Sequence, residues 1–185
     1  MIKENVENLL VVVDMVNGFV REGAMADKYI ENIIPVIVKL VEANQENTIF
    51  IKDCHEKDAI EFKSYPLHCL KGTSESELVN ELKKFENSEN VYEKNSTSAM
   101  YAENFMSDLD KMENLKQVTI VGCCTDICVL NLAIPLNNYF NQKNRNIEII
   151  VPKNAVETFD SDNHKREEYN EFAFKLMSQA GIKVV

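Results

Sequence analysis

Cys128 is the strongest candidate for a nucleophile in this chain. We expect Thr125 to cap a helix that begins at Asp126, which places the Cys128 thiol in the first helical turn. Unpaired backbone N–H groups and the helix dipole favour a thiolate there and lower the pKa of a cysteine, and the same N–H groups can stabilise an oxyanion. A buried, inert cysteine is the alternative interpretation, and Cys124, in the turn before the helix, is a rival nucleophile.

A cysteine nucleophile needs a base and usually a nearby cation. Asp14 could accept the thiol proton, and Lys94 could stabilise the thiolate while keeping Asp14 ionised. A Cys/His pair is a less economical alternative, because neither His55 nor His68 adjoins the first expected strand. Taken singly, Asp14 could instead be a capping residue and Lys94 a solvated surface charge.

A second cluster has the composition of a metal site. Asp53 and His55 flank Cys54, and Glu61 and His68 follow farther along the chain. Because side chains alternate in an extended segment, Asp53 and His55 point to one side and Cys54 to the other. This favours an Asp/His/His site over a Cys/His zinc site, and such ligands suit zinc, iron or manganese. The alternative is one core histidine and one surface histidine.

Short apolar runs alternate with longer amphipathic ones, which is typical of an α/β fold. We expect a three-layer αβα architecture, in which helices cover both faces of a mainly parallel sheet of roughly six strands. We expect one domain over residues 1–185, without a linker or repeat. The expected strands are 9–13, 48–53, 91–93, 118–122, 147–151 and 182–185. The expected helices are 28–44, 74–85 (with Ser74 and Glu77 as a capping box), 102–112, 126–139 and 164–179.

This arrangement brings the two groups of residues together. In such sheets the site lies at the carboxyl ends of the strands, near the point where the strand order reverses. Asp14, Asp53 and Lys94 each follow or end one of the first three strands, and residues 123–128 follow the fourth. No glycine-rich dinucleotide motif follows the first strand, so a Rossmann cofactor site has no support.

Several segments resemble the isochorismatase-like cysteine hydrolases. Residues 14–19 (DMVNGF) resemble the D-x-Q-N-D-F opening of that family, and residues 121–129 (VGCCTDICV) resemble its V-G-x-x-T-D-x-C-V nucleophile segment. Lys94, followed by Ser98-Ala99, resembles K-x-x-x-S-A-F. Asp53-Cys54-His55 and residues 65–73 (YPLHCLKGT) are similar to the metal segments of the nicotinamidases within the family. The likeness covers nearly the whole chain in the right order.

The resemblance implies an amidohydrolase that converts nicotinamide to nicotinate and ammonia through a cysteine thioester. It implies a triad of Asp14, Lys94 and Cys128, a cis peptide between Cys123 and Cys124, and an oxyanion hole made by the N–H groups of Cys124 and Cys128. Phe19 and Tyr65 would wall the substrate ring. It also implies a divalent metal, either zinc or else iron or manganese, bound by Asp53, His55 and His68. Glu61 resembles a fourth ligand that some relatives use.

Departures from the family pattern leave other activities open. Val16 and Gly18 replace the usual Gln and Asp, and Tyr65 replaces the commoner Trp or Phe. One alternative is another cysteine amidohydrolase, acting on a carbamoyl or ureido compound. A remoter one is a non-enzymatic zinc or thiol-redox protein, although Cys124 and Cys128 are spaced too widely for a C-x-x-C motif.

The composition of the chain narrows the classes of molecule that we expect it to bind. The chain of 185 residues has 20 Lys and Arg against 30 Asp and Glu, a formal charge of −10, which disfavours nucleic acid. The longest apolar run near the N-terminus, 9–13, is too short for a membrane span. Glu4 and Glu7, which precede it, argue against a signal peptide. We therefore expect a cytoplasmic protein with reduced cysteines. The family resemblance implies a small-molecule amide as substrate, and a homo-oligomer is a possible assembly.

Overall fold

A computed structural model of the chain describes residues 5–185, so the first four residues of the expected domain lie outside it. Seven strands form a parallel sheet in the order β3-β2-β1-β4-β5-β7, and β6 also pairs with β4. They are β1 (Asn8–Val13), β2 (Thr48–Asp53), β3 (Val91–Lys94), β4 (Gln117–Cys123), β5 (Glu148–Val151), β6 (Val156–Glu157) and β7 (Lys183–Val184). The prediction of a mainly parallel sheet of about six strands is confirmed; the short β6 was not predicted.

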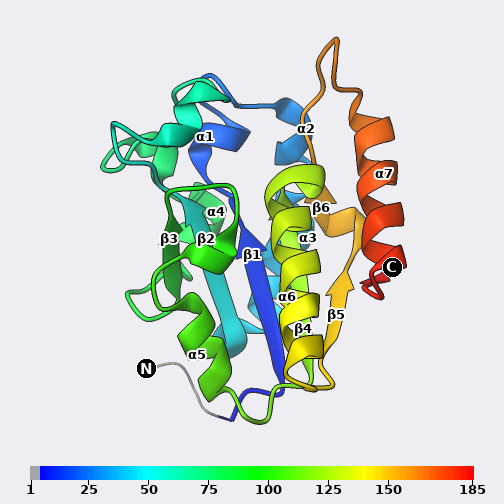
Figure 1. The fold of residues 1–185 in the computed structure, drawn as a ribbon. Coiled ribbons are helices and arrows are strands. Elements are labelled where there is room, and N and C mark those ends of the chain that lie inside the picture. Colours follow the sequence, from blue (N-terminus) through cyan, green and yellow to red (C-terminus); the bar gives the residue numbers. More distant parts are fainter. Residues whose placement is uncertain (1–4) are drawn as a thin grey trace.

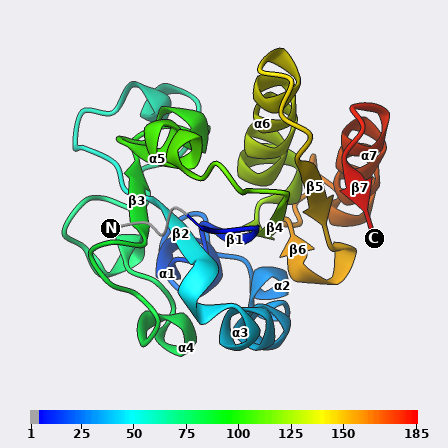
Figure 2. The same cartoon turned by 90° about the horizontal axis from the view of Figure 1, so that it is seen from below.

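Helices cover both faces of this sheet, as Figures 1 and 2 show. Alternate residues of β1 face opposite layers: Val11 packs in the core with α5, α6 and α7, and Val12 packs in the core with α1 and α3. The helices are α1 (Asn17–Val20), α2 (Lys28–Glu31), α3 (Ile34–Ala43), α4 (Asn80–Lys83), α5 (Phe105–Lys111), α6 (Leu130–Gln142) and α7 (Arg166–Gln179). The expected three-layer αβα architecture is therefore confirmed.

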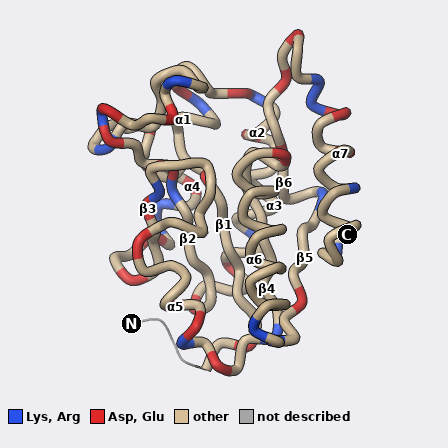
Figure 3. The backbone as a smooth tube through the Cα atoms, viewed as in Figure 1, with Lys and Arg blue, Asp and Glu red and all other residues tan. Residues whose placement is uncertain are grey.

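The two central strands of the sheet and one helix that covers them contain no charged residue. β1, β4 and α6 contain no Lys, Arg, Asp or Glu, and they are drawn entirely in tan in Figure 3. Strands buried on both faces need apolar side chains at every position, which explains the continuous run in β1. Among the described residues, no helix is both long and apolar enough to cross a bilayer.

The strand order reverses between β1 and β4, because the chain builds outward to β3 and then returns to the other side of β1. At this point Val13 lies opposite Gly122. Gly122 has φ +116°, and a Cβ there would lie 2.0 Å from the carbonyl oxygen of Val13. Only glycine allows β4 to approach β1 this closely, directly before Asp14 and the Cys123–Cys124 peptide.

The prediction of a single helix over 28–44 is wrong, because two helices, α2 and α3, occupy this segment. Pro35 stands at the start of α3, where the lack of a backbone N–H is tolerated. For the same reason Pro35 cannot donate a helical hydrogen bond to the Glu31 carbonyl. Asp27 caps α2 by accepting a hydrogen bond from the Tyr29 N–H at 2.8 Å. The proline therefore begins a new helix instead of continuing the first.

The helix expected over 74–85 is also wrong, as is its capping box of Ser74 and Glu77. A 3₁₀ turn at Ser74–Ser76 is followed by extended residues and then by the short α4. Leu78 pairs with Val16, and the N–H of Val79 donates to the segment after β1. Both side chains are fully buried, so pairing with the core outweighs local helix propensity.

Candidate active site

The turn after β4 carries Cys128. It is a π-helical turn, Thr125–Val129, in which the N–H of Val129 donates to the Cys124 carbonyl at 3.1 Å before α6 begins. This wider turn places Cys124 at the N-cap position, so the prediction that Thr125 is the cap is wrong; the Thr125 hydroxyl is buried without a partner among the described residues. The peptide between Cys123 and Cys124 is cis, as the family resemblance implied.

Lys94 lies at the centre of the expected triad. Its Nζ is 3.0 Å from Asp14 Oδ2, 3.7 Å from Cys128 Sγ and 2.5 Å from Asp53 Oδ1. All four side chains are buried, and each stands at or just after the carboxyl end of a different strand. Asp14 has a left-handed backbone, with φ 52°, which turns the chain away from β1. The fold thus brings together the three residues expected to carry chemistry.

Burial sets the protonation of this group. It raises the pKa of Asp14 to about 6, against the lowering effect of Lys94. Burial also raises the pKa of the Cys128 thiol well above its ordinary value, although Lys94 opposes the shift. The expectation of a depressed cysteine pKa is therefore wrong, because desolvation outweighs the turn and the lysine. The site at rest has a neutral thiol beside a carboxylate base.

Lys94 and Asp53 keep their charges in spite of burial. Burial opposes the charge on Lys94, but Asp14 and Asp53 together hold its pKa well above the usual range. Burial likewise opposes the charge on Asp53, and Lys94, His55 and His68 outweigh it and hold the pKa of that carboxyl well below its usual range. The lysine therefore remains a cation between two carboxyl groups and a thiol.

Asp53, His55 and His68 converge at one point. Asp53 Oδ2 lies 2.9 Å from His55 Nε2 and 3.0 Å from His68 Nε2. His68 Nδ1 donates to the Pro66 carbonyl at 2.7 Å, since a carbonyl only accepts. His55 Nδ1 lies 3.2 Å from Asn95 Oδ1, an oxygen that also accepts from the Glu56 N–H. With Nδ1 of each ring held by these outer contacts, Nε2 of each ring faces the Asp53 carboxylate.

Three converging electron-pair donors suit a cation. In a tetrahedral zinc site with bonds near 2.1 Å, neighbouring ligand atoms are about 3.4 Å apart, somewhat more than the 2.9 and 3.0 Å separations here. Outer hydrogen bonds from Nδ1 are also what metal-binding histidines need. The donor set therefore fits a divalent metal held by three residues: Asp53, His55 and His68.

Glu61 lies beside this cluster but is not one of the three converging residues. Its Oε2 is 3.7 Å from His55 Nε2, and its Oε1 accepts hydrogen bonds from the N–H and the hydroxyl of Thr97. Thr97 thus holds the carboxylate by Oε1, and Oε2 is the oxygen on the side of the metal cluster. A fourth-ligand role stays a prediction.

A small cavity joins the thiol to the metal cluster, with about 320 Å³ of empty space that includes its opening to solvent. The expected ring-binding residues Phe19 and Tyr65 line it, with Cys124 and Cys128 on the nucleophile side. The structure also places three residues there that the sequence did not single out: Met25, Thr97 and Ile127. Apolar and aromatic walls suit a small, flat substrate rather than a polymer.

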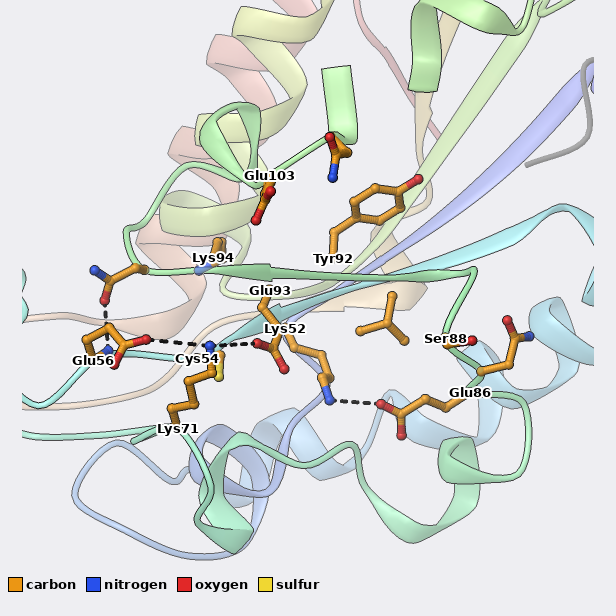
Figure 4. A pocket seen from close by; sticks show the side chains of 14 residues that line it. Lys52, Cys54, Glu56, Lys71, Glu86, Ser88, Tyr92, Glu93, Lys94 and Glu103 are labelled. Atoms are coloured by element: carbon orange, nitrogen blue, oxygen red, sulfur yellow. Dashed lines mark hydrogen bonds and ion pairs between the residues drawn. The ribbon is translucent and has the colours of Figure 1, made fainter. Parts of the chain in front are cut away.

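A larger groove lies along the edge strand β3, and it does not contain Cys128 (Figure 4). Several of its charges are paired with one another: Lys52 with Glu86 at 2.8 Å, and Lys71 with Glu56 and Glu93 at 3.5 and 3.6 Å. We interpret it as solvated surface rather than the site. Cys54 lines this groove, away from Asp53 and His55, as the strand alternation predicted.

The remaining cysteines do not form a metal or redox site. All five are free thiols. Burial raises the pKa of Cys54 to about 11 and raises that of Cys69 further. Neither belongs to the converging metal cluster of the described residues. A structural zinc or thiol-redox protein is therefore not supported.

Comparison with known proteins places the chain in a family. The isochorismatase domain model matches residues 8–185. Nicotinamidase 1 of Arabidopsis thaliana is 29% identical over 177 residues, which cover 84% of this chain and 71% of that protein. The crystal structure of nicotinamidase PncA from Bacillus subtilis has a TM-score of 0.81 at 27% identity and covers 97% of this chain and 99% of its own. N-carbamoylsarcosine amidase from Thermoplasma acidophilum has a TM-score of 0.75 at 26% identity, with 97% and 95% covered.

These matches and the geometry agree. The family model covers nearly all of the chain, and nicotinamidases occur among both the related sequences and the related structures. The protein therefore belongs to the isochorismatase family, and it is an enzyme of the amidohydrolase kind.

Proposed function

We propose that the enzyme hydrolyses nicotinamide to nicotinate and ammonia through a thioester on Cys128. The observation that carries this proposal is one small cavity lined by the Cys128 thiol, by two of the converging donors and by two aromatic rings: Cys128, Asp53, His68, Phe19 and Tyr65. A pyridine carboxamide has a ring nitrogen for the metal end and an amide for the thiol end. The nicotinamidase relatives support the same assignment.

The residues of the chain divide the chemistry between them. Asp14 takes the proton of the Cys128 thiol as sulfur attacks the amide carbon, and Lys94 stabilises the negative charge that develops. We assign the oxyanion to the backbone N–H groups of Cys124 and Cys128. Asp14 then gives its proton to the leaving ammonia, and a water that loses a proton to Asp14 hydrolyses the thioester.

A metal would complete the binding of the substrate. We propose Zn²⁺, with iron or manganese as alternatives, held by Asp53, His55 and His68 and by Glu61 as a fourth ligand. When bound, the ion supplies a Lewis acid that orients the pyridine nitrogen, directly or through water. Phe19 and Tyr65 enclose the ring, which holds the carboxamide beside the thiol.

A carbamoyl or ureido compound is the second candidate substrate. The similarity to N-carbamoylsarcosine amidase favours it, and the thiol chemistry would be the same. The two candidates differ in their need for the metal cluster, which a non-aromatic substrate would not use. Activity on nicotinamide that a chelator removes and zinc restores supports the first; chelator-resistant hydrolysis of a ureido compound supports the second.

The decisive test replaces the nucleophile. Cys128→Ala should abolish ammonia release from nicotinamide and leave the metal content unchanged, because Cys128 is outside the ligand cluster. Cys54→Ala is the matched control: it removes another buried thiol, on the groove side of β2, and should keep both. Wild-type ammonia release by Cys128→Ala would exclude the proposed nucleophile.

A further inference from the structure

His164, the histidine outside the metal cluster, contacts the turn that carries Cys128. Its Nε2 lies 2.8 Å from Asp126 Oδ2, and its Nδ1 lies 3.0 Å from the carbonyl oxygen of Phe159. The imidazole is stacked between the rings of Phe159 and Tyr169, with centroids 3.9 and 3.7 Å away. Four separate contacts thus fix one ring, although it lies outside the cavity.

The contact between His164 and Asp126 requires a proton of its own. Because the Phe159 carbonyl only accepts, His164 Nδ1 carries a proton. An ionised Asp126 also only accepts, so a second proton lies between Nε2 and Oδ2. The aromatic faces on both sides hold the ring in this orientation. Asp126 Oδ1 is buried and accepts no hydrogen bond within the described chain, so the bond to His164 is what holds this carboxylate.

The loop that carries His164 also reaches a second wall of the cavity. The N–H of Asp160 donates to Asp27 Oδ2 at 3.0 Å, and the N–H of Asp27 donates to the Phe19 carbonyl at 3.0 Å. Phe19 lines the cavity together with Cys128. The loop between β6 and α7 therefore connects the substrate wall to the nucleophile turn.

We propose that His164 and Asp126 are positioning residues that hold the 125–129 turn, so that Cys128 Sγ stays beside Asp14 and Lys94. Asp126 is two residues from the thiol and belongs to the same π-helical turn. A displaced turn would leave the rings of Phe19 and Tyr65 in place but move sulfur away from the amide carbon. The kinetic part of this inference rests on the proposed function; the position of the thiol itself does not.

Four variants test the proposal. His164→Phe keeps the aromatic stack and removes the proton between the side chains, and Asp126→Ala removes the acceptor. In Asp126→Asn the amide can donate to a neutral His164 Nε2, so the bond survives without charge. We expect the first two to lower kcat for nicotinamide by on the order of tenfold or more with little change in KM. Asp126→Asn should remain near wild type, and the His164→Phe/Asp126→Ala double variant should lose no more than the worse single.

A readout independent of catalysis accompanies the kinetics. The rate at which iodoacetamide alkylates Cys128, followed by mass spectrometry, should change in His164→Phe and Asp126→Ala and recover in Asp126→Asn. Arg166→Gln is the matched control: it breaks the 2.8 Å ion pair with Glu157 at the start of α7 without touching the 125–129 turn. It should lower stability without altering alkylation or kcat.

Two results would overturn the proposal. One is wild-type kcat and alkylation in folded His164→Phe, and the other is Asp126→Asn as impaired as Asp126→Ala. Should His164→Phe not fold, His164→Gln, whose amide can donate to Asp126, provides the rescue comparison with Asp126→Ala. If the wild-type enzyme releases no ammonia from nicotinamide, the proposed function fails, and the alkylation series alone decides the role of His164.

Discussion

Asp53 and Lys94 are direct partners across two neighbouring strands, with Asp53 Oδ1 2.5 Å from Lys94 Nζ. The other oxygen of the same carboxylate faces the Nε2 atoms of His55 and His68. Lys94 and the metal cluster therefore share one side chain. A substitution at Asp53 therefore alters both the surroundings of Lys94 and the ligand set of the metal cluster.

Replacing Asp53 by Asn should remove metal binding and activity together. The amide keeps the shape of the side chain but loses the charge that binds a cation and balances Lys94. Metal stoichiometry by elemental analysis and ammonia release by a coupled assay measure the two losses. Cys128→Ala provides the contrast, since it should lose activity alone. Full metal occupancy in Asp53→Asn would contradict the ligand assignment.

The pH profile should report Asp14. Its folded pKa of about 6 lies above the ordinary 3.8 because of burial. The base must be ionised to take the thiol proton, so kcat/KM should rise with pH through about 6 and then level. Asp14→Asn, which tolerates the left-handed backbone at this position, should remove activity at every pH. A flat profile between pH 5 and 7 would exclude Asp14 as the base.

The same shift has a cost in stability. Because the folded pKa is higher than the unfolded one, the folded state binds the proton more tightly, and stability falls as pH rises from about 4 to about 6. Asp14→Asn removes this term, so at pH 7 the inactive variant should be more stable by up to about 3 kcal/mol. Urea unfolding at pH 4 and pH 7 checks the sign. The difference between variant and wild type should shrink at the lower pH.

Glu61 and His68 should differ in their effect on metal affinity. His68 is one of three converging donors, whereas Glu61 is held by Thr97 at the edge of the cluster. His68→Ala should abolish binding of added Zn²⁺, and Glu61→Ala should weaken it by roughly ten- to a hundredfold. Calorimetric titration of the metal-free enzyme measures both. Equal affinity in Glu61→Ala and wild type would remove Glu61 from the ligand set.

Ser98 and Pro135 should be coupled in stability. Pro135 lies inside α6 and has no N–H for the Asn131 carbonyl, which accepts from the Ser98 hydroxyl at 2.9 Å instead. Ser98→Ala should cost about 0.5–1 kcal/mol. In a Pro135→Ala background the cost should be smaller, because an alanine at this position restores the helical donor. Denaturant unfolding of the four proteins in this cycle gives the coupling, and additive changes would contradict it.

The positions of the reactive residues could be predicted because parallel strands end at one edge of the sheet. The expected ends of the first three strands were enough to place Asp14, Asp53 and Lys94 at this edge. In the structure β1 ends at Val13, β2 at Asp53 and β3 at Lys94. The pKa of Cys128 could not be predicted, since it depends on burial that the local motif does not reveal. For the same reason the helix expected over 74–85 failed: its Leu78 and Val79 pair with a distant part of the chain.

Other parts of the site lack any local signal. Asn95 and Thr97 are ordinary polar residues in sequence, and only the folded chain shows them fixing His55 and Glu61. His164 and Asp126 are 38 positions apart, and their contact depends on the π-helical turn, which neither composition nor spacing indicates. A histidine without a nearby partner in sequence was the one available clue.

The strand order also sets the order in which the parts of the site are synthesised. Asp14, Asp53 and Lys94 are all made before β4, and until β4 emerges one edge of β1 has no neighbour. Cys128 follows β4 directly, so the nucleophile and the closure of the sheet centre reach the growing chain together. His164 is made later still, so under the positioning role proposed for it the nucleophile turn is held only after the loop before α7 has been synthesised.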